Sequence, residues 1–303
     1  MDIYLPIAEM SVNLLVVLAM GAVVGFLSGM FGVGGGFLMT PLLIFLGVPP
    51  TVAVGTQASQ ILASSFSSVL THLQRKTVDL AMGAVLAAGG FVGSGLGVLL
   101  FQWLRRLGYI DLVISLSYVI LLGIVGVLTL NESARAVLRT TAKGRPGQRR
   151  LHPHWWIHRL PLKFRFQRSR LYISIFVPLA VGALVGVLTA VMGIGGGFIM
   201  IPLMIYLIGM PAAVVVGTSL FQICFVAALT GFLHAYANHT VDIILGLLLI
   251  LGAVVGAQLG TRAALALRSE YLRLLLAVLI LAVCGKLLLD LVVAPEDVYQ
   301  IVA

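Results

Sequence analysis

Gly25-Phe-Leu-Ser-Gly-Met-Phe-Gly-Val-Gly-Gly-Gly-Phe-Leu-Met-Thr-Pro41 is nearly repeated, 161 residues later, by Gly186-Val-Leu-Thr-Ala-Val-Met-Gly-Ile-Gly-Gly-Gly-Phe-Ile-Met-Ile-Pro202. Both copies lie inside apolar sequence, and each contains three consecutive glycines. Glycine has no Cβ atom and destabilises the interior of a helix, so each copy predicts a break in an apolar helical segment. The chain therefore places the same break twice.

The composition predicts an integral membrane protein. Of the 303 residues, 60% are hydrophobic and only 10% are charged, whereas soluble domains carry about 25% charged residues. Apolar runs recur along the chain, and most reach the ~20 residues that cross a bilayer. The runs at 36–48 and 198–210, which follow the glycines, are shorter. We expect an all-α integral membrane protein whose helices are broken at the two glycine-rich motifs.

The similarity between the two halves extends beyond the glycines. Val54-Gly-Thr-Gln-Ala-Ser-Gln60 corresponds to Val216-Gly-Thr-Ser-Leu-Phe-Gln222 at an offset of 162, and Val78-Asp79 corresponds to Val241-Asp242 at an offset of 163. We predict two homologous helical repeats, residues 1–130 and 172–303, joined by a linker at 131–171. Internal duplication of this kind is common in secondary transporters.

The linker is strongly basic. Of the 19 Lys and Arg residues, 11 lie between Arg135 and Arg170, a stretch without Asp or Glu. Basic loops stay in the cytoplasm, so we predict a cytoplasmic linker in a multi-pass membrane protein. The same residues can bind anionic lipid headgroups. Aromatic residues beside these arginines are also typical of membrane interfaces, so we expect no nucleic-acid partner.

Basic residues elsewhere favour inverted repeats. If the short apolar segments cross the membrane, each half has five crossings, and the second half starts on the opposite side from the first. Arg75, Lys76 and Arg262 then join the linker on the cytoplasmic side, and Arg105 and Arg106 are the exceptions. We therefore predict that the repeats are inverted.

The consecutive glycines predict a binding site for a small anion. They leave backbone N–H groups uncovered, and the helix that follows has a partial positive charge at its N-terminus. Irregular backbone inside a membrane must border protein or a water-filled cavity. The alternative is close helix packing, which explains Gly21-xxx-Gly25-xxx-Gly29 and Gly93-xxx-Gly97 by their spacing. The candidate site residues are Gly34, Gly35, Gly36, Gly195, Gly196 and Gly197.

Polar residues in the next helical segment can act as uncharged ligands. Hydroxyl and amide groups bind an oxyanion without carrying a charge of their own, although such groups also hydrogen-bond between membrane helices. Both roles remain open for these residues. The candidates are Thr56 and Gln60 with their counterparts Thr218 and Gln222, and, as weaker candidates, Gln57 and Ser219.

Few titratable residues lie within the apolar segments. Asp79 and Asp242 begin a span, where a carboxylate can cap the helix or take part in proton coupling. His72 and His234 lie at the other edge of the same turn and can carry a proton. The sequence has no cluster with metal-ligand spacing and no arrangement typical of an enzyme, so we expect no cofactor, no metal and no catalytic activity.

The paired Gly-x-Gly-Gly-Gly-Phe-x-x-x-Pro blocks, each followed by a Val-Gly-Thr helix, resemble the TauE/SafE sulfite exporter family, also called the TSUP permeases. The resemblance covers about 1–130 and 171–293. It implies an integral inner-membrane carrier of small sulfur-containing anions, such as sulfite, sulfoacetate or another organosulfonate, that exports them and uses the proton gradient.

These observations lead to one expectation with two alternatives. We expect a secondary transporter in which both glycine breaks face one anion site. An anion channel, or a permease for another small anion such as thiosulfate, would share this site. The protein's partners would be the anion, protons and membrane lipids, and the sequence leaves an oligomer open.

Overall fold

A computed structural model describes residues 2–31, 35–141, 162–166, 168–169, 171–266 and 269–292. Most of these residues are helical, which confirms the predicted fold class. The helices are α1 (Leu14–Phe31), α2 (Gly36–Phe45), α3 (Pro50–Gln74), α4 (Leu80–Arg106), α5 (Ile110–Thr141), α6 (Phe176–Met192), α7 (Gly197–Pro202), α8 (Ala212–Leu233), α9 (Ile243–Ala266) and α10 (Ser269–Val292). The π-helical turns η2 (Leu203–Leu207) and η3 (His234–Asn238) extend α7 and α8.

Two short antiparallel hairpins were not predicted. One pairs β1 (Asp2–Leu5) with β2 (Met10–Asn13), and the other pairs β3 (Lys163–Phe166) with β4 (Leu171–Ser174). One hairpin directly precedes α1 and the other directly precedes α6. The second hairpin lies mostly within the predicted linker, so structural correspondence between the halves begins before residue 172.

Six helices in the described part of the chain are long and apolar enough to cross a membrane. They are Leu14–Phe31, Leu80–Arg106, Ile110–Asn131, Ala213–Asn238, Ile243–Ala263 and Leu274–Val292. Helix α3 has 25 residues but a lower mean hydropathy, because it carries a series of buried hydroxyl and amide side chains. A long helix with buried polar groups is typical of the functional centre of a membrane protein.

The chain divides into two compact units, and each takes segments from both halves of the sequence. The larger unit contains residues 1–110 and 147–266, and the smaller contains residues 111–146 and 267–303. In the smaller unit, a Cβ atom on Gly126 of α5 would lie 2.8 Å from the Leu281 side chain of α10. The predicted repeats are therefore defined by sequence similarity, whereas the two compact units are defined by which residues contact one another.

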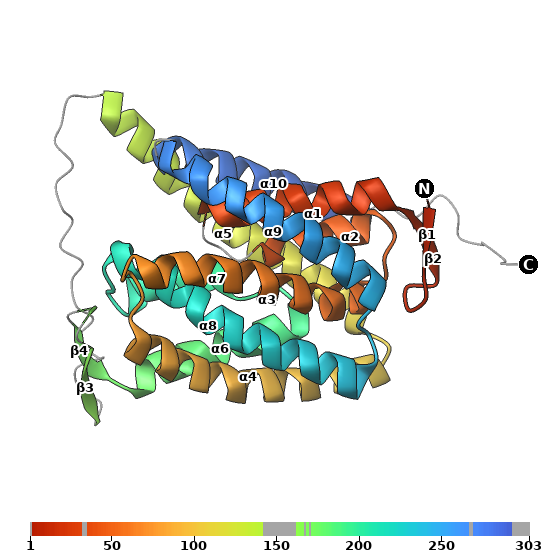
Figure 1. Cartoon of the computed structure of the whole chain (residues 1–303), viewed down its shortest axis with the longest axis horizontal. Coiled ribbons are helices and arrows are strands. Elements are labelled where there is room, and N and C mark those ends of the chain that lie inside the picture. The colour runs from red at the N-terminus through yellow and green to blue at the C-terminus, as the bar shows by residue number, and fades with distance from the viewer. Residues whose placement is uncertain are drawn as a thin grey trace, which may run out of the picture. The chain divides into compact units, whose positions relative to one another are not determined.

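Helices of the two halves pack against each other reciprocally in the larger unit. Helix α1 runs beside α9 (Figure 1), where Gly21 lies against Leu249 and Gly29 against Ala257. A Cβ atom on Gly25 would overlap the backbone of α9. The predicted role of the Gly21-xxx-Gly25-xxx-Gly29 spacing in close helix packing is therefore confirmed.

The equivalent pair, α6 and α4, packs in the same way. Gly89 of α4 lies against Leu179 of α6, and Gly97 lies against Val187. Side chains at Gly93 would overlap the α6 backbone, which confirms the packing role predicted for the Gly93-xxx-Gly97 spacing. Because contacts advance together along both helices, α6 is parallel to α4, as α1 is to α9.

Equivalent helices of the two halves run in opposite directions. The end of α3, at His72, lies beside the beginning of α8, at Gly217, so α3 and α8 are antiparallel. Helix α4 starts where α3 ends, and α6 is parallel to α4. Helix α1 ends beside the end of α3, so α1 and α6 are antiparallel too. An inverted repeat has this geometry, and inversion across a membrane stays a prediction.

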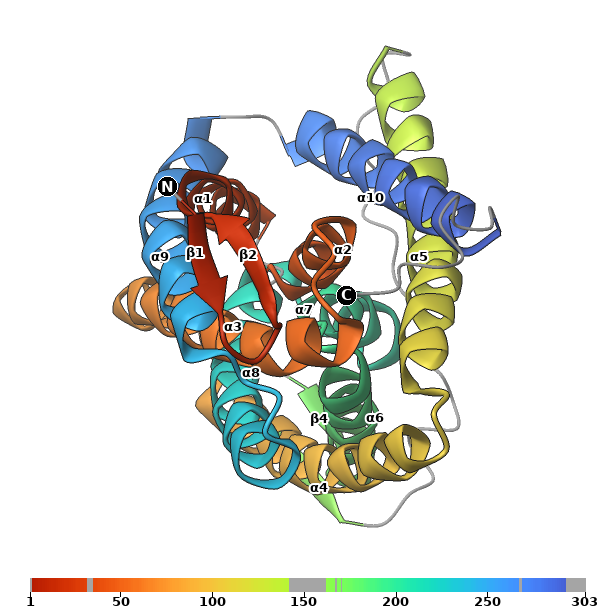
Figure 2. The same ribbon diagram turned by 90° about the vertical axis from the view of Figure 1, so that its right-hand side faces the viewer.

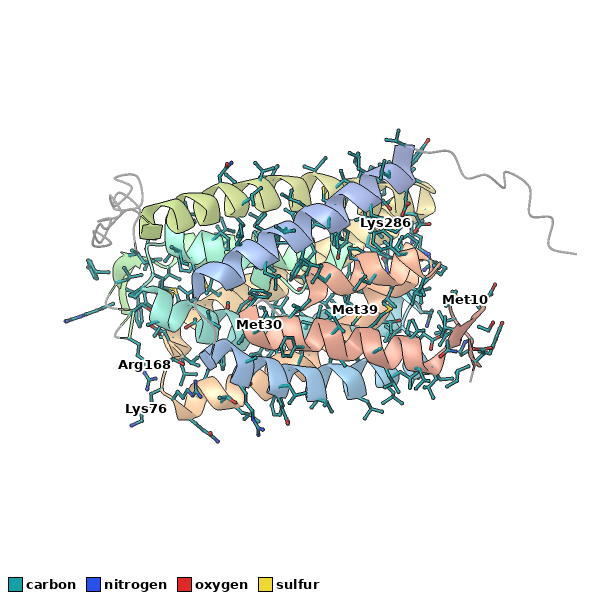
Figure 3. The ribbon with its side chains drawn as sticks, turned by 90° about the horizontal axis from the view of Figure 1, so that it is seen from above. Met10, Met30, Met39, Lys76, Arg168 and Lys286 are labelled. Carbon is teal, nitrogen blue, oxygen red and sulfur yellow. The ribbon has the colours of Figure 1, made fainter. Side chains whose placement is uncertain are left out.

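The hairpins mark the two ends of the larger unit. Arg168 in the β3–β4 turn donates to the carbonyl oxygen of Lys76 at 2.6 Å, and Figure 3 places these two residues together at one end. Met10 of β2 lies at the other end in the same view. We call the end with Lys76 and Arg168 the basic end, because Arg75 and Arg262 also lie there.

Candidate functional site

The two glycine breaks meet inside the larger unit. Phe37 and Phe198, which follow the third glycine of each motif, stack with ring centroids 4.7 Å apart and an interplanar angle of 11°. Figure 2 looks along the helices and shows α2 close to α7. Residues at equivalent positions of a two-fold arrangement can touch only near its axis. The glycine breaks therefore lie near the approximate two-fold axis that relates the two halves.

Left-handed glycines set the starts of α2 and α7. Gly35 has φ 70° and Gly196 has φ 74°, a conformation that other residues adopt at a cost. Among the described residues, no side chain caps either helix start, so the first backbone N–H groups of each helix have no side-chain acceptor there. Gly36, Gly195 and Gly197 belong to the same breaks, and Gly34 lies outside the described residues.

Gln57 connects the two breaks to each other. Its side-chain nitrogen donates to the carbonyl oxygens of Gly36 and Gly193, each at 2.5 Å, and its oxygen accepts from the Thr40 hydroxyl. Gly36 begins α2, whereas Gly193 ends α6 in the other half. Both atoms of this amide are hydrogen-bonded within the protein, so Gln57 holds the breaks together.

Gln60 and Gln222 differ sharply from Gln57. Both side chains are 0% exposed, and neither the nitrogen nor the oxygen of either amide has a hydrogen-bond partner in the described part of the chain. Leaving a buried polar group unpaired costs about 1–3 kcal/mol. The sequence repeat relates these two residues, so the same cost is present twice. Such a pair is typical of a site that awaits a polar ligand.

The surroundings place Gln60 near the second glycine break and Gln222 beside α4. A Cβ atom on Gly195 would lie 2.9 Å from the Ile61 side chain, and Ile61 directly follows Gln60. Next to Gln222, the absence of a side chain on Gly90 keeps space open, because a Cβ atom there would lie 3.0 Å from the amide nitrogen. Gly90 was not among the candidates predicted from the sequence.

Thr56 and Thr218 make reciprocal links between the halves. The Thr56 hydroxyl accepts from the backbone N–H of Asp242 at 2.9 Å, and the Thr218 hydroxyl accepts from that of Asp79 at the same distance. Each threonine therefore holds the beginning of the fourth helix of the opposite half, α9 for Thr56 and α4 for Thr218. Ser219 donates to the carbonyl oxygen of Val216 within its own helix. These hydroxyls are already in use, whereas the amides of Gln60 and Gln222 have no hydrogen-bond partner among the described residues.

The two aspartates cap helices and receive the hairpins. Asp79 accepts from the N–H of Met82 at 3.1 Å, and Asp242 accepts from that of Leu245 at the same distance. The second carboxylate oxygen of Asp79 accepts from Ser169 in the β3–β4 turn, and that of Asp242 accepts from Ile7 in the β1–β2 turn. This geometry supports the predicted capping role.

The two histidines lie in different surroundings. His234 is 0% exposed, and its ring nitrogens lie 2.9 Å from the carbonyl oxygen of Ala190 and 2.9 Å from the Asn238 amide. His72 bonds Thr77 at 2.9 Å and also lines a cavity. The antiparallel course of α3 and α8 places these histidines at opposite ends of the larger unit. They cannot act as one pair.

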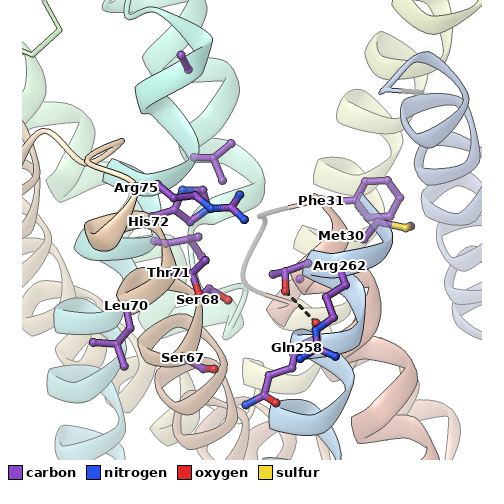
Figure 4. A pocket seen from close by; sticks show the side chains of 15 residues that line it. Met30, Phe31, Ser67, Ser68, Leu70, Thr71, His72, Arg75, Gln258 and Arg262 are labelled. Carbon is purple, nitrogen blue, oxygen red and sulfur yellow. Dashed lines mark hydrogen bonds between the residues drawn. The ribbon is translucent and has the colours of Figure 1, made fainter. Parts of the chain in front are cut away.

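A cavity of about 650 Å³ opens at the basic end of the larger unit. Helices α1, α3, α8 and α9 line it, and Figure 4 shows Arg75 and Arg262 on different walls. Ser67, Thr71 and His72 lie on the α3 wall. The sequence had placed the two arginines only as charges on the cytoplasmic side. Their convergence depends on packing between segments 187 residues apart, for which the sequence carries no local signal.

Comparison with known proteins identifies the family. The model of the family described as "Sulfite exporter TauE/SafE" matches residues 17–287. The chain belongs to this family. The resemblance predicted from the glycine blocks is therefore confirmed, and the chain is a multi-pass membrane protein of a transporter family.

Several relatives agree with this assignment. The chain is 30% identical over 269 residues to the probable membrane transporter protein YunE of Bacillus subtilis, covering 83% of this chain and 88% of the relative. It is 29% identical over 275 residues to YjnA of the same organism, covering 90% and 98%. A shorter match, 33% over 90 residues, covers 30% of this chain and 20% of sulfite exporter TauE/SafE family protein 1 of Arabidopsis thaliana. No solved structure matches the chain.

Proposed function

We propose that this protein is a secondary transporter that exports small sulfur-containing anions, such as sulfite or sulfoacetate, and couples export to the proton gradient. The family supports transport and this substrate class. The observation that carries the proposed site is the repeat-related pair of buried, unpartnered amides, Gln60 and Gln222.

The proposed site binds the anion without a fixed charge. The amide N–H groups of Gln60 and Gln222 donate to the oxyanion, together with backbone N–H groups at the starts of α2 and α7. Thr56 and Thr218 position the helices around the site, because their hydroxyls hold helix starts. Uncharged donors bind an anion less tightly than a buried guanidinium does, which allows release on the far side.

The two halves also suggest how access alternates. His234 bonds the carbonyl oxygen of Ala190 and closes the region between α6 and α8. The equivalent residues in the first half are His72 and Gly29, which both line the open cavity. We propose that the second state exchanges these arrangements, so that His72 bonds Gly29 while the His234 region opens.

Among the proposed proton carriers, His72 is best placed. It faces the cavity, whereas His234 is buried and the carboxylates of Asp79 and Asp242 cap helices. The linker 131–171 meets β3 at the basic end, so the positive-inside rule assigns this end to the cytoplasm of an inner-membrane protein. The cavity is then the cytoplasmic opening from which an exporter would load.

Flux measurements in proteoliposomes test the proposed function. Sulfite, sulfoacetate, thiosulfate and sulfate would be compared, with and without a pH gradient. We expect saturable uptake of a sulfur-containing anion, counterflow, and stimulation by the gradient. An anion channel would show neither saturation nor counterflow, and the absence of flux for all four anions would exclude the proposed substrate class.

A further inference from the structure

The cavity at the basic end carries positive charge that no described residue neutralises. Arg75 extends from the C-terminal cap of α3 and Arg262 from the last part of α9, so the two guanidinium groups come from different walls. None of the 15 lining residues is Asp or Glu. Among the residues that the structure describes, neither guanidinium has an ion-pair or hydrogen-bond partner. This cavity therefore attracts anions.

The size of the cavity indicates a vestibule and not a close-fitting site. A volume of about 650 Å³ is in the range of pockets that enclose drug-sized ligands, so a small oxyanion can enter it together with its water. Ser68 and Thr71 add hydroxyl groups between the arginines. Here the anion would be concentrated before it loses its hydration.

The other half of the protein provides an internal comparison. The sequence offsets make Ala237 the counterpart of Arg75 and Leu99 the counterpart of Arg262. Both counterparts line a second hollow, of about 460 Å³, which has no charged lining residue among those described. Two-fold symmetry alone therefore does not account for the arginines. Positive side chains line the cavity at the basic end and are absent from the described lining of the second hollow.

Orientation in the membrane explains only part of this arrangement. Basic residues are expected at the cytoplasmic end, and Lys76, next to Arg75, satisfies that expectation without lining the cavity. The rule places charge at an end but does not direct two side chains from separate helices into one hollow. A binding role explains their convergence.

We propose that Arg75 and Arg262 form a recruitment site for a sulfur oxyanion at the cavity face, which loads the central site on that face only. This inference rests on the proposed function for its substrate. A positively charged cleft raises the local concentration of an anion and its rate of association, by 10-fold or more at low ionic strength. Recruitment then gives the carrier a preferred loading side.

Transport measured separately from each face tests the recruitment site. The variant R75Q/R262Q would be compared with K76Q/R106Q, which removes two positive charges outside the cavity. Inside-out and right-side-out membrane vesicles present opposite faces to labelled sulfite. We expect R75Q/R262Q to lower the ratio of maximal rate to KM about 10-fold, through a higher KM at the cavity face and a lower maximal rate from the other face, where the KM stays within about two-fold of wild type.

Two further results decide the inference. The variant R75K/R262K keeps both charges, so we expect its KM to stay within about three-fold of the wild-type value. Unchanged KM values in R75Q/R262Q, or an equal rise in K76Q/R106Q, would overturn the inference while leaving the proposed function in place.

A binding measurement separates failure of recruitment from failure of the proposed function. Sulfate would be titrated into purified, monodisperse protein in detergent at low ionic strength. If wild type transports none of the anions but binds sulfate, and R75Q/R262Q binds it at least about 10-fold more weakly, the recruitment site stands and the proposed function fails. Equal sulfate binding by both proteins would contradict the recruitment site.

Discussion

Two glutamines three residues apart on α3 have opposite roles. Gln57 is fully buried and makes hydrogen bonds through both atoms of its amide, whereas Gln60 is fully buried and makes none with described residues. Their helix, residue type and burial are the same, so their contributions to stability differ only through their partners. The unpaired amide of Gln60 lowers the stability of the folded protein, whereas the hydrogen-bonded amide of Gln57 raises it.

This contrast predicts opposite effects of the same substitution. Gln60→Leu removes an unpaired buried amide, so we expect the free energy of unfolding to stay constant or rise by about 1 kcal/mol. Gln57→Leu leaves two carbonyl groups and a hydroxyl without their partner, and should lower the free energy of unfolding by about 3 kcal/mol. Thermal unfolding in detergent, followed by denaturant titration, measures both effects.

The same variants test the proposed site. Gln60→Leu and Gln222→Leu should each reduce the rate of sulfite transport at least about 10-fold while the protein remains folded. Gln60→Leu with lower stability and normal transport would show instead that the amide has a structural partner and no part in binding.

At the level of helices, the starts of α2 and α7 are equivalent in backbone but not in packing. A Cβ atom on Gly35 would lie 3.1 Å from the Ser28 side chain, whereas one on Gly196 would overlap Val185. Both glycines have positive φ, which costs another residue about 1–2 kcal/mol. The second break therefore has less room for change than the first.

We therefore expect Gly196→Ala to destabilise the protein more than Gly35→Ala does. Gly35→Ala should cost about 1–2 kcal/mol from backbone strain, and Gly196→Ala should cost more because Val185 must move. Both should reduce transport. Gly95→Ala is the matched control, since nothing lies within 4 Å of a Cβ atom there and alanine is the better helix former.

Thermal unfolding of the three variants gives the order directly. The expected order of stability is Gly95→Ala, then Gly35→Ala, then Gly196→Ala. Equal stability of Gly35→Ala and Gly196→Ala would mean that α6 shifts to accommodate the new methyl group. The packing difference between the two breaks would then not affect the free energy of unfolding.

The sequence predicted the helical elements and the duplication, but not the tertiary links. Hydropathy and glycine spacing are local signals, and they located the starts of α2 and α7. The partner of Gln57 at Gly193 lies 136 residues away, and the convergence of Arg75 and Arg262 likewise requires packing. The hairpins were missed because four-residue strands carry too little periodicity.

For the molecule as a whole, the antiparallel repeats predict two states with exchanged contacts. The Thr230 hydroxyl of α8 donates to the Ser94 hydroxyl of α4 at 3.2 Å. The offsets make Ser68 and Ala257 their counterparts on the cavity side. In the proposed second state, the Ser94 and Thr230 pair separates and the Ser68 and Ala257 pair approaches.

Paired cysteines measure this exchange. The cysteine pairs would be placed in a background where Cys224 and Cys284 are replaced by alanine. Without substrate, S94C/T230C should crosslink. When sulfite and a pH gradient are supplied, crosslinking of S94C/T230C should fall and crosslinking of S68C/A257C should rise. Short bifunctional thiol reagents and gel mobility provide the readout. Crosslinking of both pairs in the same proportion under all conditions would contradict the exchange.

The hydrogen bonds that the backbone N–H groups of Asp242 and Asp79 donate to Thr56 and Thr218 also have consequences for how the chain is synthesised and assembled. The start of α4 receives its threonine partner only after α8 has been synthesised, so the first half must wait in the membrane for the second. Two copies of a single ancestral half, inserted in opposite orientations, could have formed both bonds at once. The present chain would then preserve, within one gene product, the interface of an antiparallel dimer.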